Sequence, residues 1–188
     1  MKLLKYENAK LKQQHIFTLP ASQEVCGRVC PGCYAIKPQI RFPKTVLPYR
    51  ERMLESSKTD SFVSLVVQEL SSSKRPSKTV RVHESGEFYS QEYVDKWKSI
   101  ASQLPDFTFY AFTKRLKHFD FSGLKSLPNF VVIDSLHGGK LNYNTLEKLD
   151  PSRPICPVTL GQDLLCGITC RICMDKSTET TSIQFVKH

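Results

Sequence analysis

The chain has 188 residues and a formal net charge of +9, and 40% of its residues are hydrophobic. A chain of this size and composition can build one packed domain with a small appended module. Its apolar runs are too short to cross a membrane, and its basic N-terminus lacks the apolar segment of a secretory signal. We therefore expect a cytoplasmic protein that makes no membrane contact, and we exclude a secreted, disulfide-rich domain.

Four apolar segments have the composition of β-strands. The two nearest the C-terminus are almost continuously apolar, which is typical of strands that are covered on both faces in a parallel sheet. In chain order the four segments are His15–Leu19, Thr79–His83, Phe107–Phe112 and Phe130–Ile133.

Two amphipathic segments between these strands predict helices. Asp60 is a candidate cap for a helix whose apolar positions run from Phe62 to Leu70. Ser90 is a candidate cap for a second helix, over Gln91–Leu104. Because strands alternate with helices along the chain, the sequence predicts an α/β protein with a parallel sheet.

Three of the seven cysteines lie in a proline- and glycine-rich loop that follows the first strand. They are Cys26, Cys30 and Cys33. Loops that follow strand ends face the ligand side in α/β folds. Three thiolates on a cubane iron–sulfur cluster leave one iron free for another ligand. An iron–sulfur cluster is the favoured interpretation, and a zinc site completed by a histidine such as His15 or His83 is the alternative.

The other four cysteines lie in an irregular C-terminal stretch. Four thiolates can close a zinc site or a [4Fe–4S] cluster without a further ligand. Spacing alone does not separate a structural zinc knuckle from an auxiliary cluster, although the last three cysteines repeat the spacing of the first group. In a reducing cytosol, clustered thiols favour a metal over disulfides. The four residues are Cys156, Cys166, Cys170 and Cys173.

Basic residues are concentrated at Lys74–Lys78 and at Lys114–Lys117. These residues can be part of an ordinary solvated surface. The more specific alternative is that they contact nucleic acid or another polyanion. The sequence contains no helix–turn–helix, no aromatic RNA-binding pattern and no finger spacing that would support this alternative. A nucleic-acid partner is therefore a secondary hypothesis.

The spacing of Cys26, Cys30 and Cys33, in a loop after a first strand, resembles the signature of the radical S-adenosylmethionine (SAM) superfamily. A closer resemblance is to the small radical-SAM-like proteins of phages known as the gene product 88 family. This resemblance rests on segments distributed along most of the chain. They are Phe17–Ala21, Cys30–Ala35, Arg81–Phe88, Phe109–Lys114 and Cys156–Cys173.

The resemblance implies a truncated parallel (β/α) partial barrel over residues 1–149, followed by a four-cysteine metal module over residues 150–188. It also implies a [4Fe–4S] cluster on the three N-terminal cysteines, with SAM bound beside it. The C-terminal cysteines would hold a second [4Fe–4S] cluster or zinc. The residues expected to contact SAM are Ser85, Gly86, Glu87 and Tyr34.

The activity implied by the resemblance is reductive cleavage of SAM, which starts radical chemistry on an unknown substrate and requires a reducing electron donor. A phage-encoded member would act in the cytoplasm of the bacterial host. The alternative function is a basic binding protein, stabilised by zinc or by clusters, that contacts nucleic acid or a host protein without catalysis. Metal content would distinguish the two.

Overall fold

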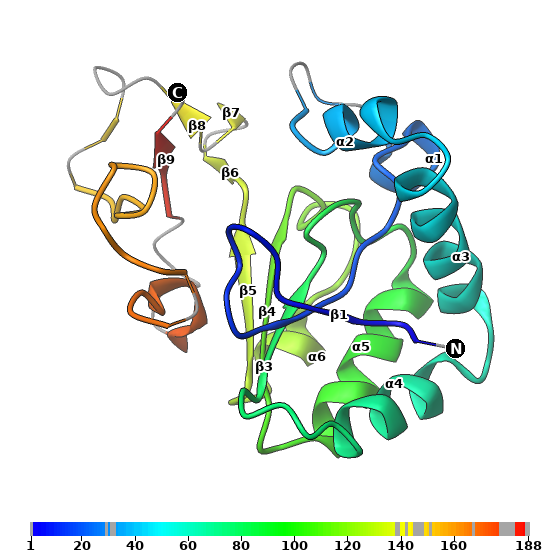
Figure 1. The fold of residues 1–188 in the computed structure, drawn as a ribbon. Helices are drawn as coiled ribbons and strands as arrows, with labels where there is room; N and C mark the ends of the chain where they lie inside the picture. The colour runs from blue at the N-terminus through cyan, green and yellow to red at the C-terminus, as the bar shows by residue number, and fades with distance from the viewer. Residues whose placement is uncertain are drawn as a thin grey trace.

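A five-stranded sheet lies at the centre of the computed structural model, which describes residues 2–28, 30, 33–137, 140–141, 143–144, 149–150, 152–166, 168–176 and 183–186 (Figure 1). The strands follow one another across the sheet in chain order. Strands β2 to β5 are parallel, and β1 pairs with β2 in the antiparallel sense. The five strands are β1 (Lys5–Tyr6), β2 (His15–Ile16), β3 (Thr79–Val82), β4 (Thr108–Thr113) and β5 (Phe130–Asp134).

The predicted α/β class and the four predicted strands are confirmed, and the antiparallel edge strand β1 was not predicted. Helices connect the parallel strands, and α3, α4 and α5 lie on one side of the sheet (Figure 1). The helices are α1 (Gln23–Cys26), α2 (Ile36–Arg41), α3 (Val46–Lys58), α4 (Phe62–Ser71), α5 (Gln91–Gln103) and α6 (Ser122–Lys125). None of the helices in the described residues is long and apolar enough to span a bilayer.

The C-terminal part of the chain lies on the other side of the sheet from α3, α4 and α5 (Figure 1). It consists mainly of turns and short pairings. Its elements, with the hairpin that leads into it, are β6 (Leu136–His137), β7 (Lys140–Leu141), β8 (Tyr143–Asn144), the 3₁₀ helix η2 (Ile172–Met174) and β9 (Phe185–Val186). The proposed division of the chain at residues 149 and 150 stays a prediction.

The helix-covered face of the sheet carries an aromatic core. The Trp97 ring of α5 makes edge contacts with the rings of Phe17 and Phe62, at centroid distances of 5.4 and 5.8 Å. Phe109 on β4 stacks on Phe130 on β5 at 5.7 Å. All five side chains are fully buried. The apolar stripe predicted for the Gln91–Leu104 segment is therefore the face of α5 that covers the sheet.

The opposite face of β4 and β5 is buried by the C-terminal segment. Tyr110, Val131 and Ile133 form a second apolar cluster with Cys156 and Met174. Because successive side chains of a strand point to opposite faces, each of these strands contributes to both clusters. This confirms the prediction, made from their almost continuous apolar sequences, that both strands are covered on both faces.

The two predicted helix caps have different outcomes. Ser90 caps α5 as predicted, because its hydroxyl oxygen accepts a hydrogen bond from the Tyr93 backbone nitrogen at 3.2 Å. The prediction for Asp60 is wrong, because Ser61 is the first flanking residue of α4 and makes no side-chain cap. The helix instead continues from a turn in which the Phe62 nitrogen donates to the Thr59 carbonyl.

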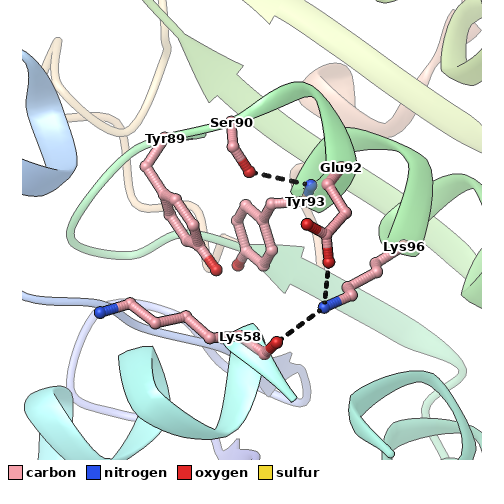
Figure 2. A pocket seen from close by; sticks show the side chains of 6 residues that line it. All are labelled: Lys58, Tyr89, Ser90, Glu92, Tyr93 and Lys96. Carbon is pink, nitrogen blue, oxygen red and sulfur yellow. Dashed lines mark hydrogen bonds and ion pairs between the residues drawn. The ribbon is translucent and has the colours of Figure 1, made fainter. Parts of the chain in front are cut away.

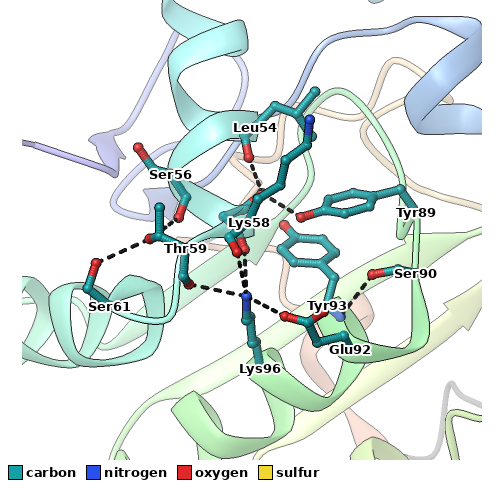
Figure 3. Close-up of polar contacts among 11 residues, drawn as sticks. Leu54, Ser56, Lys58, Thr59, Ser61, Tyr89, Ser90, Glu92, Tyr93 and Lys96 are labelled. Carbon is teal, nitrogen blue, oxygen red and sulfur yellow. Dashed lines mark hydrogen bonds and ion pairs between the residues drawn. The ribbon is translucent and has the colours of Figure 1, made fainter.

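Helix α3 was not predicted, and its C-terminal end is held by Lys96 of α5. The Lys96 ammonium group donates to the carbonyl oxygens of Ser57, Lys58 and Thr59 at 3.1–3.2 Å, and it pairs with Glu92 at 2.7 Å (Figure 3). A cation at a helix C-terminus satisfies the carbonyls that lack partners and complements the helix dipole. Lys96 therefore joins α3 to α5.

A small cavity of about 60 Å³ lies beside this joint, lined in part by Lys58, Tyr89 and Tyr93 (Figure 2). Tyr89 and Tyr93 stack with their ring centroids 4.5 Å apart. Since a water molecule takes roughly 30 Å³ in the liquid, the cavity has room for about two. The cavity therefore lies at the joint between α3 and α5 and is small.

Candidate functional site

The first cysteine group begins at the end of α1. Ser22 caps this short helix by accepting a hydrogen bond from the Val25 nitrogen, and Gly27 ends it in the left-handed conformation, with φ +72°. Cys26 is the last helical residue, and a turn follows in which the Cys33 nitrogen donates to the Cys30 carbonyl at 3.1 Å. Residues 29, 31 and 32 of the loop lie outside the described part of the chain.

The loop lies over the carboxyl ends of β3 and β4. The Cys26 thiol is half-buried and interacts electrostatically with Glu87, which follows β3, with Lys114, which follows β4, and with the Cys33 thiol. Burial raises the pKa of Cys26 to about 11. Because metals bind thiolates, a metal at this position must displace a proton. Ligands of parallel α/β sheets bind at this edge.

The turn after β3 requires glycine at position 86. Gly86 has φ +84°, and a Cβ atom on it would lie 2.4 Å from the Cβ atom of the buried Leu19. The Leu19 nitrogen donates to the Ser85 carbonyl at 2.9 Å, which holds the turn against the segment after β2. The hydroxyl oxygens of Ser85 and Thr18 are buried and have no hydrogen-bond partner among the described residues. Two buried donors are thus available at the carboxyl edge.

Glu87 links the carboxyl ends of β3 and β4. Its side chain is 3% exposed, and its two carboxylate oxygens accept hydrogen bonds from the backbone nitrogens of Phe88 at 3.1 Å and Lys114 at 2.8 Å. Burial raises the pKa of Glu87, and the bonds to these nitrogens oppose that shift. Both carboxylate oxygens of Glu87 are therefore engaged. The Ser85 hydroxyl is more available to a ligand than the Glu87 carboxylate.

Tyr34 and Arg50 fix the cysteine loop to the body of the protein. The Tyr34 hydroxyl donates to the Glu84 carbonyl at 2.6 Å, although the residue is 67% exposed. Arg50 of α3 is 5% exposed and donates to the Ala35 carbonyl at 2.7 Å and to the Gln39 side chain at 2.8 Å. Sequence reasoning missed Arg50, which is an arginine at a buried position of an unpredicted helix.

The four C-terminal cysteines lie near one another on the side of the sheet opposite α3, α4 and α5. The Cys173 thiol interacts electrostatically with the thiols of Cys156, Cys166 and Cys170, and burial raises its pKa. Cys166 and Cys170 also form an isolated β-bridge. Gln14, which is fully buried, donates from its amide nitrogen to the Cys166 sulfur at 3.9 Å. The second group is thus gathered by contacts with both its own segment and the N-terminal strand region.

Arg81 of β3 lies between the two cysteine groups. Its guanidinium group lies over the rings of Tyr110, 4.9 Å from the centroid, and Phe112, 4.3 Å from the centroid. Its positive charge lowers the pKa values of Cys173 and Cys166, against the effect of burial, and it also acts on Tyr34 in the first loop. A cation held by two aromatic rings therefore faces thiols from one group and the tyrosine beside the other.

The thiols of each group lie near one another, but they are not arranged as the ligands of a metal ion. Within the residues that the structure describes, no three histidine, cysteine, aspartate or glutamate side chains form a group that could hold a metal ion. Neither histidine considered for a zinc site belongs to such a group: His15 lies at the start of β2, and His83 lies in the aromatic core.

His83 is a buried, strained residue at the end of β3. Its φ is +65°, which is rare for a residue with a side chain. Its Nε2 atom shares a hydrogen bond of 2.9 Å with the Tyr93 hydroxyl, and its ring makes an edge contact with Phe88. Burial, reinforced by the nearby Arg81 charge, lowers the pKa of His83 to about 3. The imidazole is therefore neutral in the folded protein at physiological pH.

This neutral histidine predicts a pH dependence of stability. The unfolded chain binds a proton at His83 below its ordinary pKa of about 6.5, whereas the folded protein does not until about pH 3. The stability contributed by His83 is present above pH 6.5 and lost as the pH falls, by up to about 1.4 kcal/mol per pH unit. Urea unfolding at several pH values between 7 and 4 gives the free energy of unfolding as a function of pH. The slope of this free energy against pH should be smaller in His83→Asn than in the wild type. The matched control His118→Asn replaces an exposed histidine and should leave the slope unchanged, so equal slopes in all three proteins contradict the assignment.

Comparison with known proteins adds a family. A family model described as gene product 88 matches residues 1–163, which include the first cysteine group, the turn after β3 and Cys156. No curated protein and no solved structure matches the chain. The chain therefore belongs to the gene product 88 family.

Proposed function

We propose that this protein is a radical SAM-like iron–sulfur protein, in which Cys26, Cys30 and Cys33 hold a [4Fe–4S] cluster. The observation that carries the proposal is the position of the Cys26 thiol, which lies beside residues that follow β3 and β4 at the carboxyl edge of a parallel sheet. In this proposal, the parallel strands β2 to β5 are a truncated partial barrel. The three thiols must close around the cluster when it binds, which displaces their protons.

The residues around the loop fit a polar ligand beside the cluster. The buried hydroxyls of Ser85 and Thr18 have no hydrogen-bond partner in the described part of the chain and can donate to a carboxylate. Gly86 lets the backbone approach closely, and Tyr34 holds the cysteine loop to that turn. Glu87 keeps the ends of β3 and β4 in register rather than reaching the ligand directly.

A [4Fe–4S] cluster held by Cys26, Cys30 and Cys33 would supply the reductive cleavage of bound SAM, with the electron coming from an external reductant. The protein's own contribution is to position SAM and exclude water. At the second site, four thiolates fit either a second [4Fe–4S] cluster or zinc. Gln14 and Arg81 would offset the negative charge of either group.

Anaerobic purification followed by metal analysis tests the proposal. We expect a brown protein with roughly eight irons per chain if both groups hold cubanes, or roughly four irons and one zinc if the second site is structural. After reduction with dithionite in the presence of SAM, 5′-deoxyadenosine should accumulate. A colourless protein with two zinc ions would overturn the proposal and support a binding protein without catalysis. A protein that carries clusters but never forms 5′-deoxyadenosine would show a scaffold that has lost the reaction.

A further inference from the structure

A cavity of about 310 Å³ lies at the opposite end of the sheet from the first cysteine group. Its walls come from the N-terminal segment, from the start of β2, from the end of α4 and from the connection between α4 and β3. Because β2 and β3 are parallel, this is the amino edge of the sheet, whereas the cysteine loop lies at the carboxyl edge. At roughly 30 Å³ per water molecule, the cavity holds about ten waters, which is more than one phosphate group requires.

Three cations line this cavity: Lys2, Lys74 and Arg75. The ion pairs found among the described residues involve Lys58 and Lys96, so these three have no acidic partner there. The one acid on the wall is Glu69, whose carboxylate oxygens already accept hydrogen bonds from two backbone nitrogens, those of Leu3 and Leu4, at 2.6 and 3.0 Å. The cavity wall therefore carries three cations and one carboxylate that is already hydrogen-bonded, and its net charge is positive.

A buried histidine completes the wall. His15 is 5% exposed, and its Nε2 atom has no hydrogen-bond partner among the described residues. Its ring meets the edge of the Tyr6 ring at a centroid distance of 5.1 Å, and the Arg75 guanidinium lies over Tyr6 at 4.7 Å. A buried polar atom without a partner is costly, and a ligand that bonds to it removes that cost.

The positive charge continues outside the cavity. Lys78 is exposed, lies over the Phe107 ring at 4.6 Å and belongs to the same connection as Lys74 and Arg75. A ligand with a single phosphate would pair with the cations that line the cavity and would leave Lys78, outside it, without an anion. A strand with repeated phosphates would satisfy both, in keeping with the net charge of +9.

We propose that this cavity binds a backbone phosphate of single-stranded nucleic acid, with Lys2, Lys74 and Arg75 contacting the phosphate and His15 bonding to the same nucleotide. Lys78 contacts the next phosphate along the strand. A concave site suits a flexible strand because the backbone can enter it, whereas a flat lipid surface cannot reach a buried imidazole. This site is separate from the cysteines and does not depend on the iron–sulfur proposal.

Fluorescence anisotropy of the full chain with a labelled single strand of about 20 nucleotides tests this site. Each phosphate contact contributes about 0.7 to the slope of log K against log salt concentration, so Lys74→Gln/Arg75→Gln should lower the slope by about 1.4 and weaken binding about 25-fold at 0.1 M salt. The matched control Lys44→Gln/Lys98→Gln removes the same charge from exposed lysines outside both basic clusters and should retain the wild-type slope. Circular dichroism establishes that both variants are folded.

Proton NMR gives a readout on the unmodified protein. On titration with the strand, the imidazole resonances of His15 should shift and those of the exposed His118 should not. Three results would overturn the proposal: no strand binding, an equal loss in the control variant, or competition by a mononucleotide or inorganic phosphate as strong as that by the strand. The last result would assign the cavity to a small phosphorylated ligand. The Cys30→Ala variant should bind the strand like the wild type, so failure of the cluster proposal leaves this test intact.

Discussion

Cys30→Ala is expected to lose the first cluster completely, so that a protein with roughly eight irons retains roughly four. Two remaining thiolates cannot hold a cubane that already leaves one iron open, and SAM then has no iron to bind. We therefore expect 5′-deoxyadenosine formation to fall below detection. Iron analysis and chromatography of the products of the reduced protein measure the two effects separately.

The reciprocal variant Cys170→Ala provides the control. It removes one of the four C-terminal thiols, whose segment lies on a different face of the sheet from α3, α4 and α5. We expect it to lose the second metal and retain the first cluster with its SAM cleavage. Loss of both metals in either variant would show that the two sites do not assemble independently, and retention of all the iron in Cys30→Ala would remove Cys30 from the ligand set.

Gly86→Ala is expected to destabilise the protein by about 2–5 kcal/mol. The left-handed conformation of Gly86 costs a residue with a side chain about 1–2 kcal/mol, and forcing an atom into a packed site typically costs about 1–3 kcal/mol more. The new Cβ atom would lie 2.4 Å from the Leu19 Cβ atom and 3.1 Å from its Cα atom, so backbone must move. Urea unfolding measures the loss.

Gly161→Ala separates the two contributions. Gly161 has nearly the same φ, +79°, but a Cβ atom there would meet nothing within 4 Å. The conformational cost is therefore retained and the steric cost is absent, so a loss of about 1–2 kcal/mol is the most that we expect. If the two variants are equally stable, the contact with Leu19 does not constrain the turn after β3.

The sheet was predictable because its strands carry their own signal. β4 and β5 are buried on both faces, and the only charged residue in them is Asp134 at the end of β5, so both are visible as mainly apolar runs. Helix α5 was predictable for a related reason, since one face is uniformly apolar and Ser90 supplies its cap. In these elements the local pattern and the tertiary environment agree.

The elements that were missed are those that depend on distant partners. β1 has only two residues, and its pairing with β2 defines it. Helix α3 buries Arg50, whose charge hides the apolar face of the helix, and its bonds to the cysteine loop make this burial possible. Lys96, which ends α3, lies about forty residues further along the chain, so no local pattern marks that boundary.

The residues of the candidate site were predictable as a list of candidates but not as an arrangement. Cysteine spacing indicated both groups, and the family resemblance indicated the turn after β3. The position of Arg81 between the groups could not be predicted, because it depends on the C-terminal segment packing against β4. The basic cavity was missed because its walls come from segments that are far apart in the sequence, namely the N-terminal segment, β2 and the region around the end of α4, although the basic residues at Lys74–Lys78 were noticed.

The contact between the two ends of the chain determines when folding can finish. The Lys12 nitrogen donates to the Cys166 carbonyl at 3.1 Å, and Gln14 bonds to the same carbonyl across a separation of 152 residues. A growing chain on the ribosome can cover the helix side of its sheet once β5 has emerged. The other face of the sheet can be covered only after the C-terminal segment has been synthesised. Contacts between residues so far apart in the sequence form slowly. Until then Tyr110 and Val131 are exposed on the nascent protein.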